Sequence, residues 1–352
     1  MALSSLENRR PAEDSFRSAS FHSILGNDRA KHQLLNAVKS QQVSHAYPFE
    51  GAAGLGKHSL AAAFVKALFC EDFGKNRQDD ACLSCPSCTL IENGNHPDVK
   101  WITLKGQSED AKTIGTDRIR EEVVQDMAIL PYRSDKKVYI IEQAEKMTVG
   151  AQNALLKTIE EPPAYGMILL LTEASSSLLP TILSRCVKVN LEPLPKDLLI
   201  PALLSKGVSE EEAPTLALAC GGSLGRALLL AHDEAFLSLR EELYQFLSSL
   251  PTLSRLEVLR KESLFAAPST NRDWLFLLLS LWYRDILLLM TTGEEERLLC
   301  RDYLKSLRDL TRYYSLEKVL SILSRLSQIE ENLKRNANLP LAMDILLVTL
   351  CR

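Results

Sequence analysis

The segment Phe49-Glu50-Gly51-Ala52-Ala53-Gly54-Leu55-Gly56-Lys57-His58-Ser59 decides the fold of this chain. It predicts a strand end, a glycine-rich turn and a helix start, and it follows the phosphate-binding P-loop pattern except that His58 replaces Ser or Thr. The glycines let backbone N–H groups converge on an anion, to which the helix N-terminus and Lys57 add positive charge. We therefore expect a nucleotide pocket without the hydroxyl that normally ligates Mg²⁺. Its residues would be Gly51, Gly54, Gly56, Lys57 and His58.

Strands and helices alternate around this turn. The predicted strands are short and apolar, and segments with helical periodicity separate them. Strands that are apolar throughout are typical of a parallel sheet covered by helices on both faces. We therefore expect an α/β domain with strands at 44–49, 99–104, 138–141, 167–171 and 186–189, and with helices at 57–70, 116–128 and 148–160.

The pattern changes after Leu191-Glu192-Pro193-Leu194-Pro195, beyond which only helical periodicity continues. The most apolar run there, Trp274–Met290, contains Arg284 and Asp285, which favours a buried helix over a membrane span. We expect four parts: a loose tail at 1–20, a nucleotide-binding-like α/β domain at 21–190 with a cysteine knuckle at 70–88, a small helical lid domain at 191–233, and an all-α domain at 234–352.

Composition limits the function classes. The 352 residues carry a net charge of −4, so any contact with nucleic acid has to come from a local patch or from partner chains. The polar N-terminal residues predict no signal peptide. Eight cysteines without a secretion signal indicate a reducing, cytoplasmic compartment, where clustered cysteines bind metal more often than they form disulfides.

A second motif, Lys136-Lys137-Val138-Tyr139-Ile140-Ile141-Glu142-Gln143-Ala144-Glu145, resembles a Walker B strand. That motif ends in Asp, which holds Mg²⁺, and Glu, which polarises the attacking water. Here Glu142 is one methylene longer, and Gln143 cannot act as a base because an amide has no basic lone pair near neutral pH. An ordinary strand that ends in a solvated acid is the alternative. Together with His58, these departures predict a pocket that can hold phosphate but is poorly equipped for hydrolysis.

Four cysteines have the spacing C-x11-C-x2-C-x2-C. Four thiolates in such a pattern can close a tetrahedron around Zn²⁺ and leave no open position, which predicts a structural site. An iron–sulfur cluster is the rival, and free buried thiols are a further alternative. Zinc is favoured because the first ligand lies upstream at a helix end and because no Cys-Pro follows the last one at the expected distance. The predicted ligands are Cys70, Cys82, Cys85 and Cys88.

Two arginines are candidates for contact with phosphate. Arg185, in Leu183-Ser184-Arg185-Cys186, lies just before the fifth predicted strand. Arg226, in Gly221-Gly222-Ser223-Leu224-Gly225-Arg226, lies at a helix start and could reach back over the P-loop. A solvated or salt-bridged arginine is the alternative for each.

Taken together, these motifs resemble the delta-prime subunits of the bacterial DNA polymerase III clamp loader, in the AAA+ superfamily. The resemblance runs from about Phe21 to the end of the chain. The gamma/tau ATPase subunits share two of its segments but normally keep the Ser/Thr after the P-loop lysine and the Asp-Glu pair, from which this sequence departs. The matching segments are Ser44–Tyr47, Gly51–Lys57, the four cysteines, Gly94–Asp98, Lys137–Met147, Asn153–Pro163, Ser184–Cys186 and Asn336–Met343.

The resemblance implies a non-hydrolysing, stator-like subunit in a hetero-pentamer with gamma/tau and delta subunits. That assembly opens the sliding clamp and places it on primer–template DNA. Arg185 would act in trans, as an arginine finger in the ATP site of a neighbour, and residues 234–352 would join a helical collar. ATP binding at this chain's own site, which would also include Glu142 and Arg226, stays open.

Two other functions remain open at this point. A catalytically active gamma/tau-like AAA+ ATPase would hydrolyse nucleotide as an isolated chain. A zinc-containing nucleic-acid binder would bind DNA without partners and with a strong dependence on salt. The negative net charge argues against the second of these.

Overall fold

The computed structural model describes residues 19–75, 79–104, 113–210, 212–261, 265, 271–334 and 338–351. Most of the predicted tail and the first two residues of Asn336–Met343 lie outside this part of the chain. The chain divides into two compact units. The first comprises Met1–Leu198 with Gly222–Gly225, and the second comprises Leu199–Gly221 with Arg226–Arg352. The finer division into α/β, lid and collar domains stays a prediction.

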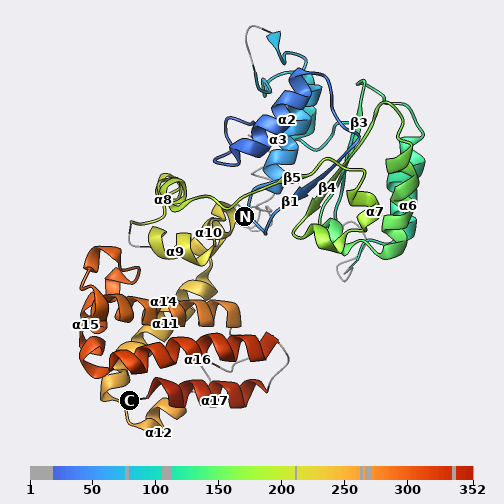
Figure 1. The fold of residues 1–352 in the computed structure, drawn as a ribbon. Helices are drawn as coiled ribbons and strands as arrows, with labels where there is room; N and C mark the ends of the chain where they lie inside the picture. The colour runs from blue at the N-terminus through green and yellow to red at the C-terminus, as the bar shows by residue number, and fades with distance from the viewer. Residues whose placement is uncertain are drawn as a thin grey trace, which may run out of the picture. The chain divides into compact units, whose positions relative to one another are not determined.

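The first unit is built on a five-stranded sheet in the order β2-β3-β4-β1-β5 (Figure 1). Every neighbouring pair of strands is parallel, which confirms the predicted α/β class. Ligands of open parallel sheets bind beyond the carboxyl ends of the strands, where the P-loop follows β1. The strands are β1 Ala46–Glu50, β2 Val99–Ile102, β3 Lys137–Ile141, β4 Gly166–Thr172 and β5 Val189–Asn190.

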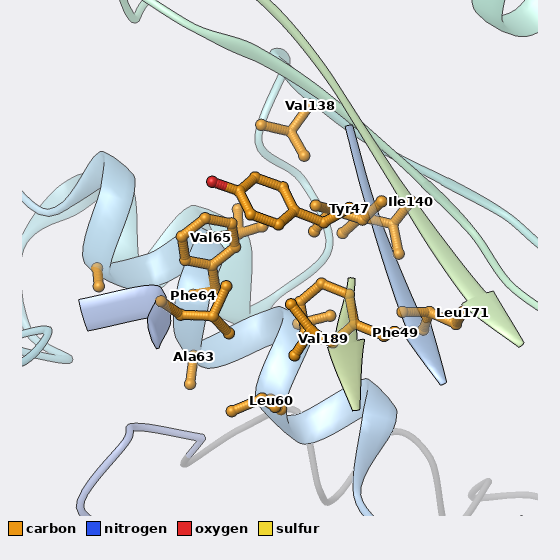
Figure 2. Close-up of a cluster of buried hydrophobic side chains, with 14 of the residues drawn as sticks. Tyr47, Phe49, Leu60, Ala63, Phe64, Val65, Val138, Ile140, Leu171 and Val189 are labelled. Carbon is orange, nitrogen blue, oxygen red and sulfur yellow. The ribbon is translucent and has the colours of Figure 1, made fainter. Parts of the chain in front are cut away.

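Helices cover both faces of the sheet. On one face α2 and α3 pack on Tyr47 and Phe49, as the close-up in Figure 2 shows for α3. The opposite face carries a second core with α5, α6 and α7, so Leu169 and Leu170 of β4 belong to different cores, as strand alternation requires. The elements are α2 Asp28–Lys39, α3 Lys57–Phe69, α4 Pro86–Glu92, α5 Thr116–Ile119, η3 Arg120–Gln125, η4 Ala144–Lys146, α6 Val149–Glu160, η5 Ser175–Ser177 and α7 Pro180–Leu183.

The largest differences from the prediction are in two elements, whereas β1 and β2 differ from it by at most two residues at an end. The helix expected at 116–128 is α5 followed by a π-helical segment, η3. Buried partners hold the end of this segment, because the Tyr139 hydroxyl donates to the Asp126 carboxylate at 2.6 Å and Lys137 donates to the Asp126 carbonyl at 2.7 Å. The strand expected at 186–189 is the shorter β5, because Cys186 still bonds back to Leu183 in the turn after α7.

Helices are the regular elements of the second unit, and the residues that the structure describes there form no strand. Its central helix, α14, packs against α11, α15 and α16. By length and composition α14 is the one described helix that could cross a membrane, but Leu278, Trp282 and Tyr283 are buried in the core of this unit. The helices are α8 Lys196–Ser205, α9 Ala213–Ala219, α10 Leu224–Ala231, α11 Glu234–Ser249, η6 Leu250–Thr252, α12 Arg255–Leu259, α14 Arg272–Thr291, η7 Glu295–Arg297, η8 Arg301–Tyr303, α15 Leu304–Tyr313, α16 Leu316–Lys334 and α17 Leu339–Leu350, of which α8 and α10 begin in the first unit.

Candidate phosphate and metal sites

The glycine-rich turn has the backbone that its sequence predicts. Gly54 and Gly56 have φ angles of +75° and +91°, a region that glycine enters without steric cost. Gly51 is packed so closely that an added Cβ would lie 3.0 Å from the Cβ of Leu191. Gly56 also precedes the first residue of α3 and has no side chain to cap it, so the first N–H groups of α3 stay available to an anion.

The Lys57 ammonium turns back onto the loop. It donates to the carbonyl oxygens of Gly51 and Ala52, the second at 3.0 Å. Burial lowers the pKa of Lys57, and the carboxylates of Glu173 and Glu145 offset part of that effect. The charge that the P-loop pattern directs at a phosphate is therefore directed at the loop itself in this conformation.

His58 lies against the end of β3. Its Nδ1 atom is 3.4 Å from a carboxylate oxygen of Glu142, and its ring stacks on Trp101 with ring centroids 5.8 Å apart. Burial and the charge of Lys57 lower the pKa of His58 to about 4, so the imidazole is neutral at pH 7 and the contact with Glu142 is polar rather than ionic. Two of the three residues that depart from the ATPase pattern in sequence, His58 and Glu142, are thus in contact with each other.

Gln143 follows Glu142 in a left-handed backbone conformation, with a φ angle of +49°. It precedes the short turn η4, whose residue Glu145 accepts a hydrogen bond from the Glu173 N–H at 3.3 Å. This turn joins the ends of β3 and β4. The position that a hydrolytic site gives to a carboxylate base therefore carries a neutral amide.

The four predicted metal ligands lie together. Their sulfur atoms are all within 4.8 Å of one another. Cys70 follows the last residue of α3, and Cys85 caps the N-terminus of α4 by accepting the Cys88 N–H at 3.5 Å. Two more N–H groups point at sulfur, from Cys82 to Cys70 at 3.3 Å and from Cys85 to Cys82 at 3.2 Å.

This cluster fits a tetrahedral metal ion. Zinc–sulfur bonds of about 2.3 Å need sulfur atoms roughly 4 Å apart, close to the observed spread. Burial raises the pKa of the Cys82 thiol, but the N–H groups of Ser84 and Cys85 outweigh it and lower the pKa to about 7. Burial raises the pKa of Cys88. The four cysteines could therefore hold a metal such as zinc, which binds the thiolate form.

Arg185 follows α7 at the surface, with 40% of its side chain exposed. One guanidinium nitrogen lies 3.0 Å from a carboxylate oxygen of Glu160, and another donates to the Thr181 carbonyl at 2.9 Å. Its partners thus come from α6 and α7, on the opposite face of the sheet from α3. Arg226 belongs to α10 in the second unit, and its role beside the P-loop stays a prediction.

The sequence patterns did not predict the contacts of two residues near these sites, Trp101 and Asp98. Trp101 gave no signal because it reaches His58 only through the pairing of β2 with β3. Asp98 is buried and accepts the N–H groups of Tyr132, Arg133 and Ser134, so it fixes the loop before β3. Its presence in the Gly94–Asp98 motif was the available signal.

A parallel sheet in the order β2-β3-β4-β1-β5, with a P-loop after β1 and an acidic residue after β3, defines a P-loop domain of the AAA+ class. A family model described as DNA polymerase III, delta subunit, matches residues 26–195.

Relatives extend this match along most of the chain. The DNA polymerase III subunit delta' of Bacillus subtilis (strain 168) is 30% identical over 320 residues, which are 90% of this chain and 94% of that protein. The subunit delta' of Pseudomonas aeruginosa is 31% identical over 87% of this chain and 92% of that protein. The subunit tau of Bacillus subtilis is 37% identical over 49% of this chain and 29% of that protein. The chain therefore belongs to the family of DNA polymerase III delta' subunits.

Proposed function

We propose that this chain is a non-hydrolysing, stator-like subunit of the DNA polymerase III clamp loader. One observation carries the proposal: His58 contacts Glu142 where a hydrolytic site would hold Mg²⁺ between a hydroxyl and a carboxylate. Mg²⁺ prefers oxygen ligands, which an imidazole does not offer. Gln143 adds a second defect, because it cannot take the proton of an attacking water. An active gamma/tau-like ATPase would need both Mg²⁺ ligation and a base that takes the proton of the attacking water.

The isolated chain tests this part of the proposal. We expect no sustained ATP hydrolysis above background with Mg²⁺, and no change of the rate in the Lys57→Ala variant. The P-loop backbone and the α3 N-terminus are still suited to a phosphate, so nucleotide binding without turnover agrees with the proposal. A steady rate that Lys57→Ala abolishes would favour the active gamma/tau-like ATPase instead.

We propose that Arg185 acts in the ATP site of a neighbouring subunit. Its guanidinium is exposed yet held by Glu160 and Thr181, so it is presented at the surface in a defined position. An arginine finger supplied in trans is worth about 10³–10⁵ in turnover in other phosphoryl-transfer systems.

The helical second unit supplies the assembly surface in this proposal. Leu341, Ile345 and Val348 of α17 are exposed by 59%, 41% and 57% and recur at a spacing that puts them on one face. An exposed apolar stripe of this kind suits a contact with other helices in a collar. The partners would be gamma/tau and delta subunits, with the sliding clamp and primer–template DNA bound by the cytoplasmic assembly.

We propose zinc as the resident metal of the four-cysteine site. Four protein ligands leave no position open for a substrate, so the site would be structural. Zinc, when bound, would cross-link the end of α3 to the start of α4, since Cys70 follows α3, Cys85 precedes α4 and Cys88 lies in the first turn of α4. Metal analysis of the purified chain tests the identity of the ion. About one zinc per chain is expected, and iron with inorganic sulfide would contradict it.

A further inference from the structure

Lys66 is a buried charge in the last turn of α3. Its side chain has no exposed surface, and its neighbours Val65 and Ala67 belong to the apolar core. An ammonium group in such surroundings is costly unless opposite charge lies close to it. A carboxylate oxygen of Glu92, in α4, lies 3.7 Å from the Lys66 nitrogen.

This ion pair stands beside the four cysteines. Lys66 precedes Cys70 by one helical turn, and Glu92 follows Cys88 by one turn of α4. Helices α3 and α4 pack against each other, so the pair joins the two elements that carry the first and the last cysteine. Burial lowers the pKa of Lys66, whereas the charges of Glu92 and Cys88 raise it.

A metal-loaded four-cysteine site would carry negative charge, which a nearby cation would stabilise. Four thiolates around a divalent ion carry a net charge of −2, in a cluster where Cys85 and Cys88 are buried. Electrostatic interactions are strong in such surroundings because little water screens them. Groups around the metal ligands that offset this charge stabilise the ion, and their loss typically costs 10–100-fold in metal affinity.

We propose that Lys66 is the charge-compensating residue of the four-cysteine site, where its ammonium stabilises the metal-loaded thiolates. Glu92 competes with the thiolates for this ammonium. This inference rests on the proposed zinc site. The effect of losing Glu92 distinguishes this role from a purely structural one. If the ion pair only held α3 and α4 together, loss of Glu92 would weaken metal binding, whereas charge compensation by Lys66 predicts no weakening.

The test measures zinc affinity of the full-length chain by competition with a chromophoric chelator. Lys66→Met keeps an unbranched side chain and removes the charge, and we expect a 10–100-fold loss of affinity. Glu92→Gln should bind zinc as tightly as the unaltered chain or more tightly. Lys39→Met is the control, because Lys39 is 47% exposed and lies 3.6 Å from Asp79, which precedes Cys82 by three residues. It should change the affinity less than threefold.

Each outcome of the zinc-affinity measurement either supports or overturns the role of Lys66. Equal affinity of Lys66→Met and the unaltered chain overturns the inference, as does a tenfold loss in Glu92→Gln. If Lys66→Met does not unfold cooperatively, the Glu92→Gln result alone decides, and unchanged or tighter binding supports the inference. If the unaltered chain itself takes up no zinc, the proposed zinc site fails and the role of Lys66 falls with it.

Discussion

His58 stands where the P-loop pattern has the Ser or Thr that ligates Mg²⁺, and its imidazole is uncharged at pH 7. Its pKa is lowered to about 4 by burial and by Lys57, whereas an unfolded chain releases this proton at about pH 6.5. As the pH falls from 6.5 towards 4, the unfolded state takes up a proton that the folded state does not. The contribution of His58 to the free energy of unfolding is therefore fully present above about pH 6.5 and is lost as the pH falls from 6.5 to about 4.

We expect the His58→Gln variant to lose less stability than the unaltered chain between pH 7 and pH 4.5. The difference should be on the order of 1 kcal/mol, because the side chain is 33% exposed and water screens part of the effect. Urea unfolding at both pH values measures it. Between pH 7 and pH 8 the two proteins should change in parallel. Identical losses down to pH 4.5 would show that His58 is not held neutral by its surroundings.

The cysteine knuckle is the element whose order would depend most on a bound metal. Its turns are held by few apolar contacts, chiefly Ala81 and Leu83 with the cysteines themselves. In contrast, β3 and β4 are buried along their whole length and paired with each other. A bound ion would therefore contribute more to residues 79–92 than to the sheet.

Removal of metal with a chelator should raise amide hydrogen exchange in residues 79–92 by at least tenfold and leave β3 and β4 protected. Hydrogen exchange with mass spectrometry resolves the two regions in one experiment, and added zinc should restore the slow exchange. Unchanged exchange in 79–92 after verified metal loss would mean that these turns fold without the ion.

Elements with strong periodicity could be predicted from sequence, and contacts between elements could not. The apolar strands β3 and β4 and the P-loop helix α3 lie where their patterns place them. The π-helical segment η3 has no sequence signature, because its geometry depends on the buried partners of Asp126. The four cysteines could be predicted because three of them are neighbours in sequence. The pairing of His58 with Glu142, and of Lys66 with Glu92, needs the packing of separate elements.

On the scale of the whole molecule, the apolar stripe on α17 tests the assembly role. The Ile345→Glu variant should fold as an isolated chain with a change in unfolding free energy within about 0.5 kcal/mol, as is usual for exposed sites. Its incorporation into a reconstituted complex should fall at least tenfold, because a charge at that position would be buried against a partner. Size-exclusion chromatography with the partner subunits measures incorporation.

The control for this variant is Leu229→Glu, because Leu229 is 55% exposed in α10 and lies outside the stripe. It should enter the complex as the unaltered chain does. Normal incorporation of Ile345→Glu would exclude α17 as the contact surface, whereas a loss in both variants would point to a general effect of added charge.

The central claim is that this chain supports ATP hydrolysis in a neighbour and performs none itself. The most direct measurement is the DNA-stimulated ATPase rate of the reconstituted complex with Arg185→Ala, Lys57→Ala or Arg133→Ala in this chain. Arg133 is the matched control, since it is an exposed arginine 3.5 Å from a carboxylate oxygen of Glu71. We predict that Arg185→Ala alone lowers the rate, by the contribution of the neighbouring site, where turnover falls about 10³-fold or more. An unchanged rate in Arg185→Ala, or a loss in Lys57→Ala, would contradict it.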